Sequence, residues 1–433
     1  MIETVQLQKL RRFDSMDMAD KVHYTAHAEL DKPDGFYHCG ETAVCKVDFY
    51  RNGEKYNGRI RCRICIENKI VFSRNADYKG KPLEFRIRCP HPGWVCFSFQ
   101  ILSSHDRPLR GEKLWKHPRK PSVVEDIGAV FDPDRLHRLT PRPKDFDAFW
   151  ERQKTQLGKI PFRTVKKELP VPEQYKGKVK LFAVTLSIGE RQNATGYLAV
   201  PADAKPGSLR AELVTYGYGT PRQGPPKRVS PRQMTLWINA HGQELGRDDA
   251  YYKEFFRSIR TPKYTYAFNP DENKDPETAY FNGMALRVMR ALEYLKSRPE
   301  WDGKNLKASG GSQGGLQTMW AAALDPDVND AAPSITWCCD LAGQSKAGRI
   351  HGPWRIPYTP ALDYYDPVFM AKRIKKAQVD IRRAGLGDYT CPPSGLAICY
   401  HNLATPKKSI KWVQGSDHGF VPKKSEIVLW KTY

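Results

Sequence analysis

Residues 307–320 read KASGGSQGGLQTMW, where a short strand-like lead is followed by four glycines around Ser312 and then by a helix-forming run. The pattern G-x-S-x-G between a strand and a helix is typical of a strained turn that presents a nucleophile, because small residues let neighbouring chain segments come close. A phosphate-binding loop would require a lysine after the glycines, and a dinucleotide site would require an acidic residue after the next strand. We therefore interpret the stretch as a nucleophile elbow at Ser312 and not as a flexible loop.

Predicted strands alternate with predicted helices from about residue 131 onward. The strands are expected at 178–188, 194–202, 210–219, 233–242, 305–309, 379–385 and 409–415, and the helices at 143–157, 280–301, 314–324 and 394–404. The longest helix is predicted because its apolar residues recur with helical spacing. This alternation predicts an α/β domain over 131–433, built on a mostly parallel sheet with helices on both faces.

Residues 1–130 have a different pattern, which predicts a small all-β, sandwich-like domain. Short runs rich in Val, Ile, Phe and Cys lie at 43–50, 58–66, 82–89 and 94–102, separated by turn signals. Residues 107–126, rich in proline and basic residues, are interpreted as a linker or an irregular connection. Trp94 and Trp115 are candidates for a glycan-binding platform, although single tryptophans more often belong to a core.

The chain of 433 residues carries a net charge of +22, which raises the question of nucleic-acid binding. The basic residues are dispersed and no nucleic-acid motif accompanies them, so we expect a solvated basic surface instead. No apolar run approaches the roughly 20 residues of a membrane-spanning helix, and no membrane partner is expected. The first residues lack the features of a signal peptide, so we expect a cytoplasmic protein, or a periplasmic or secreted one if a leader has been removed.

Ten cysteines leave the redox compartment open. Cys62 and Cys65 form a CxxC, but no second pair has matching spacing and the context resembles a strand. We expect buried thiols or an occasional disulfide here, and predict neither a metal site nor a cofactor.

Two further residues complete a candidate catalytic set with Ser312. Asp388 follows the strand 379–385 and His418 follows the strand 409–415, which gives the chain order Ser, Asp, His of this class of hydrolase. His418 would accept the serine proton and Asp388 would orient the imidazolium. His241, after the strand 233–242, would be the base only if the order were unusual, and Asp417 is too close to His418 in sequence to point correctly.

Backbone N–H groups of Gln313 and Tyr218 are the expected oxyanion donors. Gln313 follows the nucleophile, and Tyr218 lies in a loop after an earlier strand, which is where the second donor belongs. The alternative for Tyr218 is that it simply covers the sheet edge together with Tyr216.

Residues from about 131 onward resemble the acetyl xylan esterase / cephalosporin C deacetylase family of α/β-hydrolases. The resemblance lies in DFDAFW, GYG, YFNGMALRVMRALEYLKSRPE, ASGGSQGG, YYDPVFMAKRIKK, AGLGDYTCPPS and GSDHG. It implies a metal-independent serine esterase with Ser312, Asp388 and His418 as catalytic residues, oxyanion amides at Gln313 and Tyr218, and a pocket that Tyr218 helps to close around acetate. It also implies a homo-oligomer. The loop INAHGQELG departs from the family pattern, since His241 replaces an arginine.

The leading hypothesis is a carbohydrate O-deacetylase that forms an acetyl-serine intermediate on acetylated oligosaccharides or small acetylated sugars. The alternatives are a serine peptidase of related fold and a catalytically silent, glycan-binding protein. The N-terminal domain could bind polysaccharide, alter assembly or shape the rim of the active site.

Overall fold

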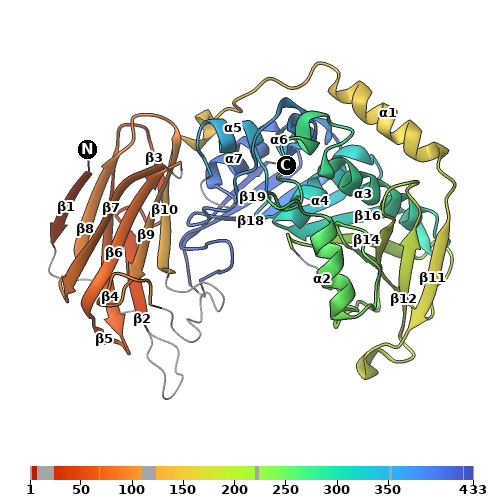
Figure 1. Cartoon of the computed structure of the whole chain (residues 1–433), viewed down its shortest axis with the longest axis horizontal. Coiled ribbons are helices and arrows are strands. Elements are labelled where there is room, and N and C mark those ends of the chain that lie inside the picture. The colour runs from red at the N-terminus through yellow and green to blue at the C-terminus, as the bar shows by residue number, and fades with distance from the viewer. Residues whose placement is uncertain are drawn as a thin grey trace.

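The computed structural model describes residues 2–6, 24–67, 69–109, 123–219, 224–350, 354–422 and 424–432. Two five-stranded sheets make up the N-terminal region, and a ten-stranded sheet with helices makes up the remainder (Figure 1). The two regions lie at opposite ends of the molecule's long axis and meet where the blue C-terminal strands approach the orange N-terminal ones.

The N-terminal region is a pair of sheets packed face to face. One sheet has the order β1-β8-β4-β2 with β5 paired to β4, and the other has the order β3-β10-β9-β6-β7. Their strands are β1 (Ile2–Gln6), β2 (Tyr24–Leu30), β3 (Phe36–Tyr37), β4 (Thr42–Arg51), β5 (Glu54–Lys55), β6 (Asn57–Ile66), β7 (Lys69–Lys79), β8 (Leu83–Arg88), β9 (Gly93–Ile101) and β10 (Val123–Phe131). Inward-facing residues of both sheets, such as Val47, Phe85 and Phe97, form one buried core. The four predicted runs all lie in strands of this region.

The large sheet has the order β11-β12-β13-β15-β14-β16-β17-β18-β19-β20, and its central strands from β15 to β19 are parallel. Its strands are β11 (Thr164–Leu169), β12 (Val179–Leu186), β13 (Ala194–Pro201), β14 (Leu209–Thr215), β15 (Met234–Ile238), β16 (Trp301–Gly311), β17 (Asp330–Ser334), β18 (Gln378–Gly385), β19 (Lys408–Val413) and β20 (Ile427–Thr432). The expected parallel sheet is therefore present, with antiparallel strands at both edges.

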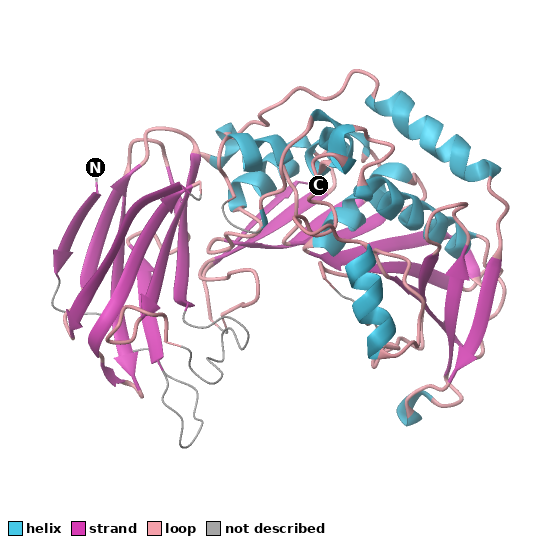
Figure 2. Cartoon of the chain, in the orientation of Figure 1, coloured by secondary structure: helices cyan, strands magenta, loops and turns pink. Residues whose placement is uncertain are grey.

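Most of the helices lie above the large sheet in the view of Figure 2, whereas α2 extends downward in front of it. They are α1 (Phe146–Lys159), α2 (Asp249–Ser258), α3 (Tyr280–Lys296), α4 (Gln313–Leu324), α5 (Leu341–Lys346), α6 (Pro367–Met370) and α7 (Pro393–Asn402). Apolar residues of α1, α3, α4, α6 and α7 form one continuous core with one face of the sheet. In the described ranges, no helix is long and apolar enough to cross a membrane.

The prediction that helices cover both faces is wrong for the centre of the sheet. Crossovers between parallel strands are right-handed, and every step from β15 through β19 moves in one direction along the sheet, so their helices fall on one face. Only the step from β14 to β15 runs the other way. That connection, residues 216–233, is rich in proline and glycine and forms no helix in its described part.

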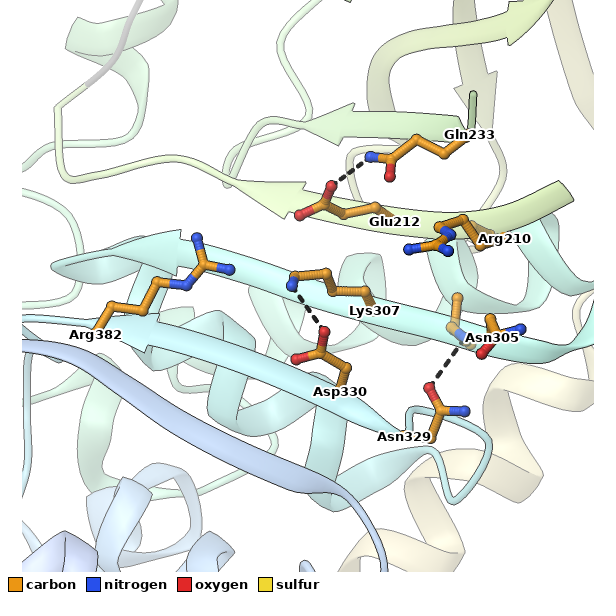
Figure 3. Close-up of a pocket in the computed structure, with 10 residues that line it drawn as sticks. Arg210, Glu212, Gln233, Asn305, Lys307, Asn329, Asp330 and Arg382 are labelled. Carbon is orange, nitrogen blue, oxygen red and sulfur yellow. Dashed lines mark hydrogen bonds and ion pairs between the residues drawn. The ribbon is translucent and has the colours of Figure 1, made fainter. Parts of the chain in front are cut away.

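The face left open carries charged side chains and a polar pocket of about 270 Å³ (Figure 3). Lys307 on β16 pairs with Asp330 on β17 at 2.7 Å, and Gln233 donates to Glu212 on β14 at 2.6 Å. The alternating apolar and polar residues of these strands thus separate a helix-covered face from a solvated one.

Candidate active site

Ser312 occupies a sharp turn between β16 and α4. Its φ of 59° and ψ of −120° lie in a region that non-glycine residues rarely adopt, at a cost of about 1–3 kcal/mol. Three backbone hydrogen bonds hold the turn: Ser312 N–H donates to Ser334, and its carbonyl accepts from Leu316 and Trp337. The surrounding structure therefore imposes a strained conformation on this serine, as the elbow interpretation predicts.

The glycines around Ser312 have different environments. A Cβ on Gly310 would lie 2.5 Å from Thr215 Oγ1, and one on Gly314 would lie 2.4 Å from the Thr215 carbonyl oxygen. A Cβ on Gly315 would lie 2.9 Å from the Ser334 carbonyl oxygen, whereas a Cβ on Gly311 would make only an ordinary contact with that oxygen at 3.8 Å. The turn is thus pressed against the end of β14, while Gly311 is not crowded.

Asp388 and His418 meet through a hydrogen bond of 3.0 Å between His418 Nδ1 and Asp388 Oδ2. Asp388 is fully buried, and its other oxygen accepts the backbone N–H groups of Thr390 and Cys391 at 2.9 and 3.0 Å. The His418 side chain is 24% exposed and can be reached from solvent. The carboxylate is therefore fixed on one side by its own loop and faces the imidazole on the other.

Ser312, Asp388 and His418 follow the carboxyl ends of β16, β18 and β19, which lie at the same edge of the parallel sheet. Cys391 lies beside the candidate acid and base, because its sulfur is within 4.8 Å of ligand atoms of Asp388 and His418. Sequence reasoning assigned Cys391 no role. The signal available in the sequence was that Cys391 lies three residues after Asp388, the candidate acid.

Gln313 and Tyr218, the expected oxyanion residues, are joined by a third residue that the sequence did not indicate. The Tyr266 hydroxyl donates to Gln313 Oε1 at 2.9 Å and accepts from the backbone N–H of Gly219 at 2.9 Å. The ring of Tyr218 stacks on that of Tyr266 with a centroid distance of 4.1 Å. The turn after β16 and the loop after β14 are thus tied together by one phenol.

Tyr218 is the centre of an aromatic cluster. Its ring meets Trp337 and Trp354 edge-on at 5.3 and 5.2 Å, and its hydroxyl bonds Thr265 Oγ1 at 2.9 Å. Burial raises the pKa of Tyr218 to about 12, so the phenol stays neutral. The cluster places an apolar wall beside the loop that carries Tyr218.

His241 lies in an aromatic enclosure formed by Phe256, Tyr266 and Tyr280, which shares Tyr266 with the Tyr218 cluster. Its Nδ1 is bonded to the Tyr280 hydroxyl at 2.9 Å, and burial followed by the nearby Arg287 charge lowers the pKa of His241 to about 3. This histidine is an uncharged, buried hydrogen-bonding residue.

Asp417 accepts the N–H of Gly419, two residues further along the chain, at 2.9 Å. The carboxylate bonded to His418 is that of Asp388, as chain order predicts.

The N-terminal region contacts the loop that carries Asp388. The indole N–H of Trp94 on β9 donates to the Leu386 carbonyl at 2.7 Å, and the Trp94 side chain has no exposed surface. Trp94 is therefore part of the interface between the two regions and offers no glycan-binding platform. Trp115, the other candidate, lies outside the described residues.

The same region also contacts the loop that carries His418. The side chain of Gln414 accepts the Gly128 N–H at 3.0 Å and donates to the Gly128 carbonyl at 2.8 Å, pairing with the backbone of β10 as a strand would. A Cβ on Gly128 would lie only 1.8 Å from the Leu386 carbonyl oxygen. The two regions therefore approach backbone to backbone.

A buried carboxylate reinforces this contact. Glu67 accepts the Ser394 hydroxyl at 2.7 Å and the Trp94 N–H at 2.7 Å, and lies 3.6 Å from Arg349. Of the three roles considered for the N-terminal region, these contacts favour the third, shaping the rim of the active site, since they reach the loops of Asp388 and His418.

All ten cysteines are free thiols, and nine of them are buried. Cys62 and Cys65 lie on β6, and burial raises the pKa of both thiols. Within the described part of the chain, the one group of three possible metal ligands is Asp388, Cys391 and His418.

Residues 134–348 match the acetyl xylan esterase (AXE1) family. The chain is similar to the acetyl esterase Axe7A of Xylanibacter ruminicola, with 28% identity over 289 residues, which is 65% of this chain and 64% of that protein. The chain thus spans less than two thirds of this relative's length.

Two solved structures share the fold. An acetyl xylan esterase from Paenibacillus sp. R4 has a TM-score of 0.57 and 24% identity, covering 67% of this chain and 94% of that one. Acetyl xylan esterase 1 from Thermoanaerobacterium sp. JW/SL YS485 has a TM-score of 0.56 and 18% identity, covering 67% and 93%. The resemblance expected from the sequence motifs is confirmed.

Proposed function

Since residues 134–348 match the acetyl xylan esterase family, we propose that this protein is a carbohydrate esterase that removes O-acetyl groups from sugars by way of Ser312. The observation that supports the mechanism is that a strained serine and a hydrogen-bonded Asp388–His418 pair follow strands that end at the same edge of the sheet. A likeness to esterases alone would leave the reacting residues open.

The proposed reaction has two stages. Ser312 Oγ attacks the acetyl carbonyl while His418 takes the hydroxyl proton, and Asp388, which accepts the Nδ1–H, stabilises the imidazolium. The tetrahedral intermediate collapses to acetyl-Ser312, and the sugar alcohol leaves with the proton from His418. Water then attacks the acetyl-enzyme and gives up a proton to His418. His418 returns this proton to Ser312 Oγ as acetate is released.

The negative charge on the tetrahedral oxygen requires donors that are already in place. We assign these to the backbone N–H groups of Gln313 and Tyr218. The support is the Tyr266 hydroxyl, which fixes the Gln313 side chain and the Gly219 backbone at once. Because Gly219 follows Tyr218 directly, this bridge sets the separation of the two proposed donors.

The aromatic cluster supports a small acyl group. Tyr218, Trp337 and Trp354 present ring edges and faces to one another beside the proposed oxyanion loop. We propose that this wall accepts an acetyl methyl and disfavours longer acyl chains, and that the natural substrates are acetylated oligosaccharides or small acetylated sugars.

We also propose a homo-oligomer that uses β20. This edge strand exposes Ile427 and Leu429 by 50% and 57%, and exposed apolar edges favour pairing with another chain. Light scattering on the Ile427→Lys/Leu429→Lys double variant should give a smaller particle than the wild type. Thr432→Lys, which adds charge to the same strand without removing apolar surface, is the matched control and should leave the mass unchanged.

The central test compares neighbouring acids and the nucleophile. Ser312→Ala should lower the hydrolysis of nitrophenyl acetate by at least about 10³-fold, and Asp388→Asn should have a large effect, whereas Asp417→Asn should retain most activity.

A fluorophosphonate should label the wild type at Ser312. Acetate release from a panel of acetylated oligosaccharides, without peptide cleavage, would identify the substrate class. Equal activity of wild type and Ser312→Ala would refute the mechanism.

A further inference from the structure

Cys391 places a third metal-binding group against the proposed acid and base. Its sulfur, an Asp388 oxygen and a His418 ring nitrogen all lie within 4.8 Å of one another. Cys391 and Asp388 are 1% and 0% exposed, while the His418 side chain, at 24%, opens to solvent. A small ion can therefore enter past the imidazole and meet donors that are already gathered.

The donor set is selective. A thiolate, an imidazole and a carboxylate suit zinc and related soft or borderline cations, whereas magnesium and calcium prefer oxygen ligands. Three protein ligands leave a fourth tetrahedral position, which a water molecule would complete.

Hydrogen bonds from neighbouring groups also fix the orientation of the ligands. The backbone N–H groups of Thr390 and Cys391 fix one oxygen of Asp388, and the other, which is bonded to His418 Nδ1, faces the cation position. Arg383 donates to the His418 carbonyl at 3.2 Å and anchors the histidine's backbone. Such supporting hydrogen bonds orient ligands and typically change metal affinity by about 10- to 100-fold.

From this arrangement we infer that Asp388, Cys391 and His418 bind one zinc-like divalent cation, and that binding excludes catalysis. On binding, the sulfur–hydrogen bond is replaced by a sulfur–metal bond and the proton leaves to solvent. An imidazole nitrogen donates its lone pair to the cation, and the carboxylate turns from the imidazole to the metal.

The inhibitory part of this inference rests on the proposed function of His418, whereas the binding part rests on geometry alone. An imidazole engaged by a cation and separated from Asp388 cannot accept the Ser312 proton. Zinc should therefore inhibit reversibly, with activity restored by a chelator, and magnesium should have no effect.

Cobalt is the probe that separates binding from activity. Co²⁺ added to the full chain should produce a thiolate-to-metal charge-transfer band in the near ultraviolet with one ion per chain, and Zn²⁺ should displace it. Cys391→Ser should abolish the band and raise the zinc concentration for half-inhibition by about tenfold or more. Cys62→Ser, which removes a buried thiol from β6, is the matched control and should retain both signals.

Three results would overturn the inference: no cobalt band in the wild type, a band that survives in Cys391→Ser, or full activity with the cation bound. The spectrum needs no catalysis, so it distinguishes this failure from failure of the esterase proposal. If the wild type were no more active than Ser312→Ala, the proposed function would fail while the band still decided whether the site exists.

Discussion

The indole N–H of Trp94 donates a 2.7 Å hydrogen bond to the Leu386 carbonyl, joining residues 292 positions apart in the chain. Leu386 lies two residues before Asp388, so an N-terminal strand supports the loop of the proposed catalytic acid. Through Gln414, the neighbouring β10 also supports the loop of His418. The N-terminal region therefore contacts the loops of both Asp388 and His418, the proposed catalytic partners of Ser312.

Trp94→Phe tests this connection. The substitution keeps most of the ring volume and leaves the buried Leu386 carbonyl without its donor, which should lower the free energy of unfolding by about 1–3 kcal/mol. We also expect a lower kcat with a smaller change in KM, because the acid loop loses a fixed point. Trp301→Phe removes an indole donor at a more exposed position, Trp301 Nε1 to Asn305, and should change kcat little. Equal effects of the two substitutions would contradict the supporting role.

Gly128→Ala tests the close approach of the two regions. Its Cβ would lie 1.8 Å from the Leu386 carbonyl oxygen, so the backbones must separate. We expect a loss of about 1–3 kcal/mol in unfolding free energy and a fall in kcat/KM. Gly158→Ala on α1, where a Cβ meets nothing within 4 Å, should instead stabilise the protein by about 0.5–1 kcal/mol. Chemical unfolding and ester hydrolysis of both variants measure these outcomes.

Tyr266→Phe tests the bridge between the proposed oxyanion donors. The ring and its stacking on Tyr218 are kept, but Gln313 Oε1 and the Gly219 N–H lose their shared partner. Because the donors would be less well fixed, kcat should fall on the order of tenfold, less than the roughly 10²-fold or more for losing a donor outright. KM should change little. Tyr280→Phe removes a neighbouring hydroxyl that bonds His241 and should leave kcat closer to the wild type.

The elbow, the acid and the base were predictable because each follows directly from local sequence. Small residues flank Ser312 where β14 crowds the turn, and Asp388 and His418 come immediately after apolar strands. The parallel topology then brings strand ends together. Their roles in catalysis stay predictions until the variants are measured.

Other features depend on contacts between distant segments and left no local signal. β17 reads DAAPS, which has little strand propensity and forms because β16 and β18 flank it. Tyr266 lies in an irregular loop, and its bridging hydroxyl is defined only by the fold. From the sequence, Trp94 could be either a glycan-binding platform or a core residue, and its burial decides between the two. The open face of the large sheet results from the direction of the crossover from β14 to β15. This direction is known only once the strand order is known.

His241 provides a prediction on acid stability. Burial lowers the pKa of His241 to about 3, whereas in the unfolded chain a histidine has a pKa near 6.5. Between these values the unfolded state binds a proton that the native state does not, so stability should fall as pH falls through this window and be unaffected by this group above about pH 7. The slope should approach about 1.4 kcal/mol per pH unit from this group. Unfolding free energies of His241→Phe should show a shallower decline between pH 6 and 4 on this account. The exposed His105→Gln should keep the wild-type slope, and an unchanged slope in His241→Phe would mean that other groups control the acid transition.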